Sequence, residues 1–443
     1  MNGLLAAQSV WPVERIKNHI SKIGSGITPS GGAAGYLDVG VPLLRSQNVH
    51  FDGLRLDDVA YIAEETHDEM SGSKVRAHDV LLNITGASIG RCTFVPDDFG
   101  EGNVNQHVCI IRPTARLDHK FLTYCLSAPW GQEQVFSSFT GASRQGLGQR
   151  DLGSIQLPLP PLAEQQRIAA YLDASCAAID AAVAAKRRQL ETLDALRKYI
   201  IQRAVTRGIA EGVGLESTGN GWMAQIPIGW KLVCLKRIAE IQGGLTLGKQ
   251  YEGPLIERPY LRVGNVQDGH LDLDDVSVIE LPASVAPGVE LRAGDVLMTE
   301  GGDLDKLGRG HVWNGEIPGC LHQNHIFAVR CFLHKLKPLF LAYLTASNYG
   351  RDYFEATGKK TTNLASTNAT KVGEFPIPLP CLTEQEAICS YLERHLGELK
   401  SIVTGIESQI ATLTAYRKSL IHECVTGQRR ITEADLNQIE AHG

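Results

Sequence analysis

Two short segments of this chain contain residue types that could bind a nucleotide or a metal. Gly243 to Gln250 (GGLTLGKQ) nearly fits the pattern G-x-x-x-x-G-K-[ST] of loops that hold nucleotide phosphates, but Gln250 stands where the pattern needs a magnesium-binding hydroxyl. Cys320, His322 and His325 lie close together in the sequence, but a zinc site needs about four ligands and no second ligand pair is present. A glycine turn and structural side chains are therefore the favoured interpretations.

No complete set of catalytic residues is apparent. The run from Glu300 to Lys306 could imitate the acidic metal site of a nuclease, but the matching segment from Ile84 carries no acid. The stretches Asn-Pro-Pro-Tyr and Asp-Pro-Pro-Tyr, which are the usual motif of amino-methyltransferases, do not occur. The sequence therefore predicts a noncatalytic protein that recognises a target while other chains supply any chemistry.

The composition limits how this chain could bind nucleic acid. Its 443 residues include 43 Lys and Arg against 49 Asp and Glu, a formal charge of -6. This argues against coating of DNA or an anionic membrane by bulk positive charge, because that attraction grows with the number of neutralised phosphates. Any DNA-binding surface must therefore be local. Ten scattered cysteines, no secretion signal and no apolar stretch near twenty residues predict a cytoplasmic protein without a membrane segment.

The chain contains an internal repeat. The segment LPLPPLAEQQRIAAYLD from Leu157 recurs from Ile377 as IPLPCLTEQEAICSYLE at an offset of 220, and this register holds without a gap to Thr206 and Thr426. The preceding segments also correspond, with small shifts: PLLRSQNV matches PYLRVGNV, and VRAHDVLL matches LRAGDVLM. The repeat predicts the order globule, helix, globule, helix.

The globules contain short apolar runs bounded by Gly, Asn, Asp and Pro, which is typical of mixed, strand-rich domains. We therefore expect an α+β protein with two similar mixed α/β globules, two long helices and a pseudo-twofold internal repeat. The expected segments are a first globule at 1–156, a long helix at 157–210, a linker at 211–229, a second globule at 230–376, a second long helix at 377–426 and a tail at 427–443.

Both long helices show a heptad pattern of apolar residues over five heptads. The seam consists of Leu172, Ile179, Val183, Leu190, Leu193 and Ile200 in the first helix, and of Leu392, Leu396, Leu399, Val403, Ile406, Ile410, Leu413 and Leu420 in the second. The seams could pack on their own globules, or on each other as an antiparallel coiled coil, which we favour. Lys186, Arg197 and Arg417 also occupy seam positions, where we expect them to extend to solvent or to meet a third chain.

Polar residues suited to DNA recognition recur in both globules, because arginine and amide side chains can hydrogen-bond base edges or contact phosphates. The candidates are Arg45, Gln47, Asn48, Gln106, Ser143, Arg144 and Gln145 in the first globule, and Arg262, Asn265, Gln323, Lys359, Lys360, Thr361, Thr362 and Asn363 in the second. The pairs Asn105-Gln106 and His322-Gln323 align approximately. A solvated turn is the alternative for any one candidate, and the two arginines could equally form internal ion pairs.

The whole chain resembles the specificity subunit of type I restriction-modification systems. The most specific elements are PLPPLAEQQRI and PLPCLTEQEAI at the start of the long helices, and GWMAQIPIGW from Gly221 before the second globule. The spacing of two variable globules around two long helices is similar as well. Two residues depart from the pattern: Cys381 replaces the second proline of the second signature, and Ala387 stands where the first copy has Arg167.

The resemblance implies that each globule is a target recognition domain for half of a bipartite, asymmetric site in double-stranded DNA. It also implies an antiparallel coiled coil that spaces the domains and docks two modification subunits, with restriction subunits as further partners. S-adenosylmethionine, ATP and magnesium would belong to these partners, and no cofactor or metal is expected in this chain. The assembled complex would be a site-specific endonuclease and DNA adenine methyltransferase.

Two other functions are alternatives. A duplicated protein-protein scaffold without DNA binding would fit the acidic net charge, whereas a fused nuclease-specificity enzyme is disfavoured by the missing motifs. A filter-binding assay with and without methyltransferase partners tests the scaffold. Cleavage or methyl transfer by the purified chain alone would indicate the enzyme.

Overall fold

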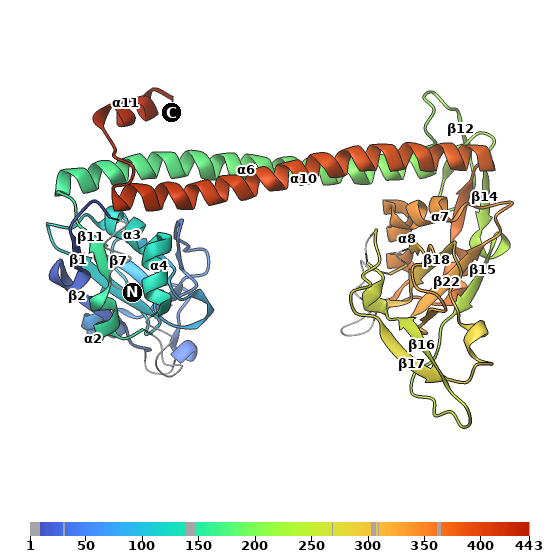
Figure 1. Ribbon diagram of the computed structural model, residues 1–443, viewed down its shortest axis with the longest axis horizontal. Helices are drawn as coiled ribbons and strands as arrows, with labels where there is room; N and C mark the ends of the chain where they lie inside the picture. The colour runs from blue at the N-terminus through green and yellow to red at the C-terminus, as the bar shows by residue number, and fades with distance from the viewer. Residues whose placement is uncertain are drawn as a thin grey trace. The chain divides into compact units, whose positions relative to one another are not determined.

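The computed structural model describes residues 9–29, 32–137, 147–267, 269–302, 307–308, 310–360 and 365–442. The chain divides into two compact units, unit 1 with residues 1–187 and 407–443, and unit 2 with residues 188–406. Each unit contains one globule and parts of two long helices, α6 (Leu162–Arg207) and α10 (Leu382–Thr426) (Figure 1). The helices have 46 and 45 residues, which confirms the long helices predicted from the heptad pattern.

The core of the first globule is a four-stranded antiparallel sheet. Its strands lie in the order β2 (Ile20–Ser25), β10 (Val108–Pro113), β7 (Val80–Asn83) and β8 (Cys92–Phe94). Successive side chains point to opposite faces of a strand. Ile111 therefore packs with α3 (His119–Ser127), α4 (Pro129–Ser137) and the long helices, whereas Ile110 packs with Leu81 on the other face. Because both faces are covered, the central strands are apolar at nearly every position.

Smaller sheets and short helices surround this core. A three-stranded sheet has the order β6 (Ala60–Ile62), β3 (Val41–Leu44) and β9 (Asn103–Val104), and β4 (Val49–His50) pairs with β5 (Gly53–Leu54). The short helices are α2 (Glu64–Glu69) and α5 (Gln149–Ser154). Finally, β1 (Val13–Arg15) pairs with β11 (Gln156–Pro158). Since β11 leads directly into α6, this pairing brings the beginning and the end of the globule to the start of the long helix.

The second globule repeats this plan. Its central sheet has the order β15 (Ala239–Gly243), β22 (Ile326–Cys331), β18 (Asp295–Thr299) and β20 (Gly310–Val312). The side sheet is β17 (Ser277–Leu281), β16 (Ile256–Leu261) and β21 (Leu321–His322), and β14 (Lys231–Cys234) pairs with β25 (Pro376–Leu379) before α10. The helices are α7 (Pro338–Ala346), α8 (Asn348–Thr357) and α9 (Ala369–Glu374). The matched element order confirms two similar mixed α/β globules.

Two segments outside the globules also have secondary structure. The predicted linker contains β12 (Leu215–Ser217) and β13 (Gln225–Pro227), which pair antiparallel. Its Trp222 ring lies 5.2 Å from the Tyr353 ring of the second globule. The tail contains α11 (Glu433–His442), which follows the buried Ile431 in the core of unit 1. The linker therefore contacts the second globule within unit 2, and the tail begins on unit 1.

A buried glutamine attaches each long helix to its globule. Gln165 accepts a hydrogen bond from the Asp118 amide at 2.9 Å and donates to the carbonyl oxygens of Arg116 and Pro160 at 3.1 and 2.9 Å. Gln385, 220 positions later, accepts from the Lys337 amide at 2.8 Å and donates to two carbonyl oxygens in the same way. The repeated glutamine of the two helix signatures thus has a structural cause.

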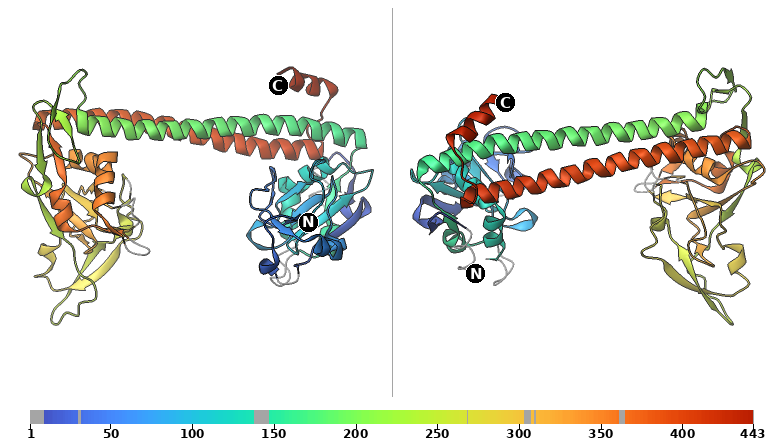
Figure 2. Two further views of the ribbon diagram at one scale, coloured as in Figure 1. Left: turned by 180° about the vertical axis from the view of Figure 1, so that it is seen from behind. Right: turned by 45° about the horizontal axis from the view of Figure 1, so that its top comes forward.

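The two long helices run in opposite directions where they meet inside each unit (Figure 2). In unit 1, Arg417 Nε lies 3.1 Å from Asp180 Oδ1, and Lys186 Nζ donates to Gln409 at 2.5 Å. In unit 2, Ile201 near the end of α6 shares a core with Leu392 near the start of α10. The basic seam residues of unit 1 are therefore satisfied at the edge of the helix pair.

One helix in the described part of the chain, α6, is long and apolar enough by composition to span a membrane. One such helix is weak evidence, because a core helix of a globular protein passes the same test. Two carboxylates in α6 make polar contacts within unit 1: Asp173 with Lys120 and Tyr124, and Asp180 with Arg417. These contacts favour a helix that packs on protein.

Candidate nucleic-acid interface

Loops gather at one end of the central sheet of the first globule. The last residue of β7, Asn83, pairs with the first residue of β10, Val108, so the segments that follow and precede them leave the sheet together. The Asn83 side-chain amide also donates to the Ser46 carbonyl oxygen at 2.8 Å, which adds a third loop. We call residues 45–48, 84–91 and 105–107 the loop end of unit 1.

The second globule has a matching loop end. Thr299 of β18 pairs with Ile326 of β22, and the backbone N–H of Gln323 donates to the Leu261 carbonyl oxygen at 2.9 Å. Two further short strands lie here, because β24 (Ala365–Ser366) pairs with both β19 (Gly301–Gly302) and β23 (Lys359–Lys360). We call residues 262–265, 300–302, 323–325 and Lys359 the loop end of unit 2. The structure therefore brings the candidates Arg262, Gln323 and the exposed Lys359 to one surface.

A glycine allows close backbone approach at each loop end. A Cβ atom on Gly26 would lie 1.7 Å from the Val104 carbonyl oxygen, and one on Gly244 would lie 2.2 Å from the Gln323 carbonyl oxygen. Both distances are impossible for a real side chain. These glycines therefore determine how closely the chain after β2 and after β15 can approach the two loop ends.

Two of the predicted base-reading amides have a different role. Asn48 is 1% exposed; it accepts from the Arg45 amide at 2.9 Å and donates to the carbonyl oxygens of Arg55 and Asp58 at 2.8 and 3.3 Å. Asn265 makes the same three kinds of contact in unit 2. With every hydrogen-bonding group of the amide used and little surface exposed, these residues hold the loop. The structure therefore corrects their assignment as groups that contact bases.

The arginines beside these amides form the internal contacts that the sequence left as an alternative. Arg45 Nη2 donates to the Asp58 carbonyl oxygen at 2.9 Å, and its guanidinium lies 5.6 Å from the Tyr36 ring. Gln47 donates to the Asp58 carboxylate at 2.5 Å. Arg262 Nη2 lies 2.8 Å from Asp275 Oδ2. The acids of these pairs are exposed, and exposed ion pairs contribute only about 0–1 kcal/mol, so these contacts hold the arginines weakly.

A histidine occupies the same position in each loop end. The sequence analysis considered His325 only as a metal ligand and did not consider His107. The strand registers of the two sheets make His107 and His325 equivalent positions at an offset of 218, since NQHVCIIR aligns with QNHIFAVR. The approximate alignment of Asn105-Gln106 with His322-Gln323 was therefore wrong by one residue. His107 Nδ1 lies 2.5 Å from Thr85 Oγ1, and His325 Nδ1 lies 3.0 Å from Glu300 Oε2. The His325 side chain is 53% exposed.

Cys320, His322 and His325 do not converge on a common point. The Cys320 thiol donates to the Leu321 carbonyl oxygen at 3.4 Å, His322 Nδ1 contacts the Val289 carbonyl oxygen at 3.0 Å, and His325 contacts Glu300. Burial lowers the pKa of the His322 imidazole and raises the pKa of the Cys320 thiol to about 12. Within the described residues, no group of three or more His, Cys, Asp or Glu could hold a metal ion.

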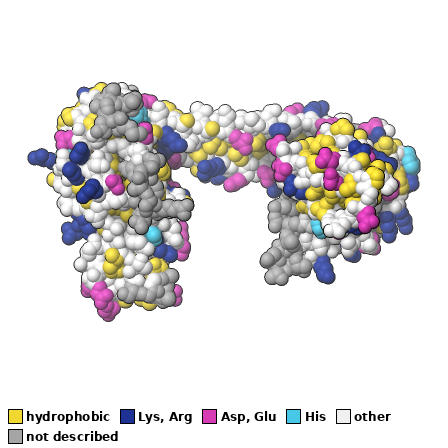
Figure 3. All heavy atoms as spheres, turned by 60° about the horizontal axis from the view of Figure 1, so that its bottom comes forward, with side chains coloured by type: hydrophobic (Ala, Val, Ile, Leu, Met, Phe, Trp, Pro, Cys, Tyr) yellow, Lys and Arg dark blue, Asp and Glu magenta, His cyan; other side chains and the backbone are white. Residues whose placement is uncertain are grey.

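The remaining candidates are placed only in part. Gln106 is exposed at the loop end of unit 1, with its amide 3.0 Å from His107 Nε2. Ser143, Arg144 and Gln145, and Thr361, Thr362 and Asn363, lie outside the described residues, and of Lys360 only the backbone strand is described. On the face drawn in Figure 3, Lys and Arg side chains are interspersed with Asp and Glu. This mixture of charges (Figure 3) agrees with the formal net charge of -6, which excludes a basic surface over the whole chain.

The fold and these paired loop ends define a class of duplicated α+β protein with two similar polar surfaces on separate globules. Residues 61–192 and 227–412 match the family described as Type I restriction modification DNA specificity domain. The chain belongs to this family. DNA recognition is therefore favoured over a scaffold that never binds DNA, and the resemblance drawn from the sequence is confirmed.

Known relatives cover nearly the whole chain. The EcoKI specificity subunit of Escherichia coli K12 is 22% identical over 88% of this chain and 82% of its own length. The MjaVIII specificity subunit of Methanocaldococcus jannaschii is 26% identical over 97% and 95%. Both are named as specificity subunits of type I restriction enzymes.

Two solved structures share the fold. One is a chain from work on complex assembly and conformational transition of the type I R-M system; its TM-score is 0.69 and its identity 18%, over 94% of this chain and 97% of that one. The HsdS subunit of Thermoanaerobacter tengcongensis has a TM-score of 0.55 and 17% identity, over 95% and 97%. The two-globule, two-helix plan is therefore one that specificity subunits share.

Proposed function

We propose that this chain is the noncatalytic specificity subunit of a cytoplasmic type I restriction-modification complex, and that it binds a bipartite, asymmetric site in double-stranded DNA. The carrying observation is the pair of matched loop ends, one on each globule, with a histidine directly before the matching strand in both. Each loop end would contact one half-site. The target recognition domains would be residues 1–156 and 230–376.

The two long helices form the spacer in this proposal. Contacts between the start of α6 and the end of α10 in unit 1, and between the end of α6 and the start of α10 in unit 2, support an antiparallel coiled coil with pseudo-twofold symmetry. The half-buried seam positions Val403, Ile406 and Ile410 alternate with exposed residues, as a two-helix seam requires. The spacer helices would occupy 157–210 and 377–426, with a linker at 211–229 and a tail at 427–443.

Partner subunits would supply the chemistry. Two modification subunits would bind S-adenosylmethionine and methylate adenine, and restriction subunits would use ATP and magnesium. This chain would contribute DNA contacts from Arg45, Gln47, Gln106, Arg262, Gln323 and Lys359, together with the loop residues Ser143, Arg144, Gln145, Lys360, Thr361, Thr362 and Asn363.

Methylation mapping of the chain assembled with its modification partners tests this function. We expect methylated sites with two constant half-sites, and exchange of residues 1–156 for the same domain of a relative should change only one of them. Alteration of both halves would contradict independent recognition domains. Failure of the assembled complex to retain any duplex in a filter-binding assay would instead support a scaffold.

The matched histidines provide a sharper test with a control in the same globule. Replacement of His107 by alanine should relax preference within one half-site, at a cost of about 1–3 kcal/mol if the imidazole contacts a base. His78 has an exposed side chain, at 49%, whereas His107 is half-buried; His78 stacks on His119 and precedes β7, away from the loop end. His78→Ala should leave the half-site unchanged, and equal effects of the two variants would remove His107 from the interface.

A further inference from the structure

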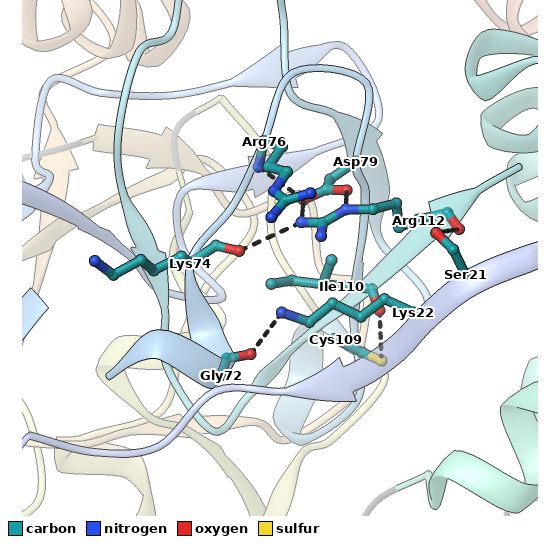
Figure 4. A network of polar contacts seen from close by, with 9 residues as sticks. All are labelled: Ser21, Lys22, Gly72, Lys74, Arg76, Asp79, Cys109, Ile110 and Arg112. Atoms are coloured by element: carbon teal, nitrogen blue, oxygen red, sulfur yellow. Dashed lines mark hydrogen bonds and ion pairs between the residues drawn. The ribbon is translucent and has the colours of Figure 1, made fainter. Parts of the chain in front are cut away.

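A hollow of about 530 Å³ lies at the other end of the central sheet of the first globule. Lys22 on β2 pairs with Arg112 on β10, four residues along the strand from the loop end. The polar residues that line this hollow include Lys22, His67, Lys74, Arg76, Glu101 and Arg112, and we call it the basic hollow. Figure 4 shows Lys22, Lys74, Arg76 and Arg112 on neighbouring segments around it.

Two of the four cations have carboxylate partners. The Arg112 guanidinium contacts both oxygens of the buried Asp79, at 2.6 and 2.7 Å. The Lys74 ammonium lies 2.7 Å from Asp68. The charges of Arg112 and Lys74 are therefore balanced within the globule.

The other two cations have no carboxylate of their own. Lys22 Nζ donates to the Gly72 carbonyl oxygen at 2.6 Å, which is a neutral acceptor. Burial lowers the pKa of the Lys22 ammonium, and the neighbouring Arg112 lowers it further. Arg76 is exposed and makes no ion pair with any described residue. Glu101, the acid that lines the hollow, lies 3.7 Å from His67. Like charges held together in this way repel each other unless an anion binds between them.

The second globule has acids at two of the matching positions. Lys22 lies opposite Arg112 in the first sheet, and Glu240 lies opposite the matching Arg330 in the second. Glu240 is therefore the counterpart of Lys22. Lys74 forms an isolated β-bridge with Asn103, and Glu290 forms the equivalent bridge with Leu321 in the second globule. The buried Asp295–Arg330 ion pair, at 2.7 Å, repeats Asp79–Arg112. The scaffold of the hollow and two of its cations are therefore common to both globules, because Arg292 and Arg330 match Arg76 and Arg112. Acids replace Lys22 and Lys74 in the second globule, so the excess of positive charge is found in the first.

We propose that the basic hollow of the first globule binds a phosphate-group anion, and that the matching place in the second globule does not. A phosphate group carries about -1.5 to -2 charges at neutral pH, which suits two cations without carboxylates. Its oxygens can accept hydrogen bonds from the Lys22 ammonium and the Arg76 guanidinium. This site lies at the opposite end of the sheet from the loop end, so it goes beyond the proposed reading of bases. The phosphate can be free or part of a DNA backbone.

Calorimetric titration of inorganic phosphate into the full chain, with chloride holding the ionic strength constant, tests this site. We expect saturable binding that weakens at least tenfold in Lys22→Glu and in Arg76→Gln. The matched control Glu240→Gln, in the second globule, should bind phosphate like the original chain. Arg76 is exposed, so Arg76→Gln remains informative if Lys22→Glu fails to fold. Absence of saturable binding, or equal binding by Arg76→Gln and the original chain, would overturn the proposal.

A second arm with a short duplex of unrelated sequence separates the two sources of phosphate. If the hollow takes a backbone phosphate, the duplex should displace inorganic phosphate, and Arg76→Gln should lower the salt slope of DNA binding by about one. If it takes a free anion, phosphate binding should be lost in Arg76→Gln while DNA affinity stays the same. Both outcomes support the site. Failure of the half-site experiments would leave the phosphate titration intact, so the two proposals can fail separately.

Discussion

Replacement of Gln165 by leucine should selectively destabilise unit 1. The side chain is 1% exposed and satisfies three backbone groups, the Asp118 amide and the Arg116 and Pro160 carbonyl oxygens. Each buried group left without a partner costs about 1–3 kcal/mol. Burial of the leucine methyl groups recovers about 1–2 kcal/mol. We therefore expect a net loss of roughly 3 kcal/mol in the free energy of unfolding of unit 1.

Native-state hydrogen exchange measures this loss separately in the two units. A single unfolding temperature would be ambiguous, because a chain with two compact units need not unfold in one step. Amides of β7 and β10 report on unit 1, and amides of β18 and β22 report on unit 2. Exchange in β7 and β10 should accelerate by about a hundredfold in Gln165→Leu, since each 1.4 kcal/mol is a factor of ten.

The chain offers two controls for this experiment. Gln166 is the next residue of α6 and is exposed, so Gln166→Leu should leave exchange in both units nearly unchanged. Gln385→Leu should accelerate exchange in β18 and β22 and spare β7 and β10. If Gln165→Leu accelerated both units equally, or neither, the attachment of each globule by one buried glutamine would be refuted.

Three further predictions use matched or single changes. Gly26→Ala should cost about 3 kcal/mol or more, because its Cβ would overlap the Val104 carbonyl oxygen, whereas Gly24→Ala meets only an ordinary 3.5 Å contact; native-state hydrogen exchange compares them. Gly427→Ala should destabilise more than Gly212→Ala in the same assay, since both have positive φ but only the first Cβ would overlap another side chain. Because burial lowers the pKa of His322, unit 2 should lose stability as pH falls below about 6.5, and hydrogen exchange should show a smaller loss in His322→Asn.

The helices and the repeat were predictable because they depend on local, periodic signals. Apolar residues at heptad positions and an ungapped offset of 220 require no knowledge of distant contacts. The observed helix starts, Leu162 and Leu382, keep that offset. The order of globules and helices could therefore be deduced from the sequence alone. The class of protein, a noncatalytic recognition subunit, could be deduced in the same way.

The site residues were harder to predict because side-chain type does not reveal direction. Asn48 and Asn265 have the chemistry to contact a base, yet the fold turns both amides inward. The match between His107 and His325 was missed because the offset changes from 216 at β7 and β18 to 218 at β10 and β22. Strand pairing reveals that change directly, whereas a one-dimensional comparison reveals it only if a two-residue shift is allowed.

Comparison of equivalent residues in the two globules distinguishes residues that maintain the fold from residues that can determine sequence preference. Buried polar groups that satisfy backbone or charge are repeated: Gln165 with Gln385, Asp79 with Asp295, and Asn48 with Asn265. A buried polar group is costly unless its partners stay in place, so these residues cannot vary independently of the fold. Exposed positions are free of that constraint, and many of them differ between the globules. If the two globules read different half-sites, matched residues such as His107 and His325 can contact DNA in both, but a difference in sequence preference must come from unmatched exposed residues. The matched buried residues keep the framework the same.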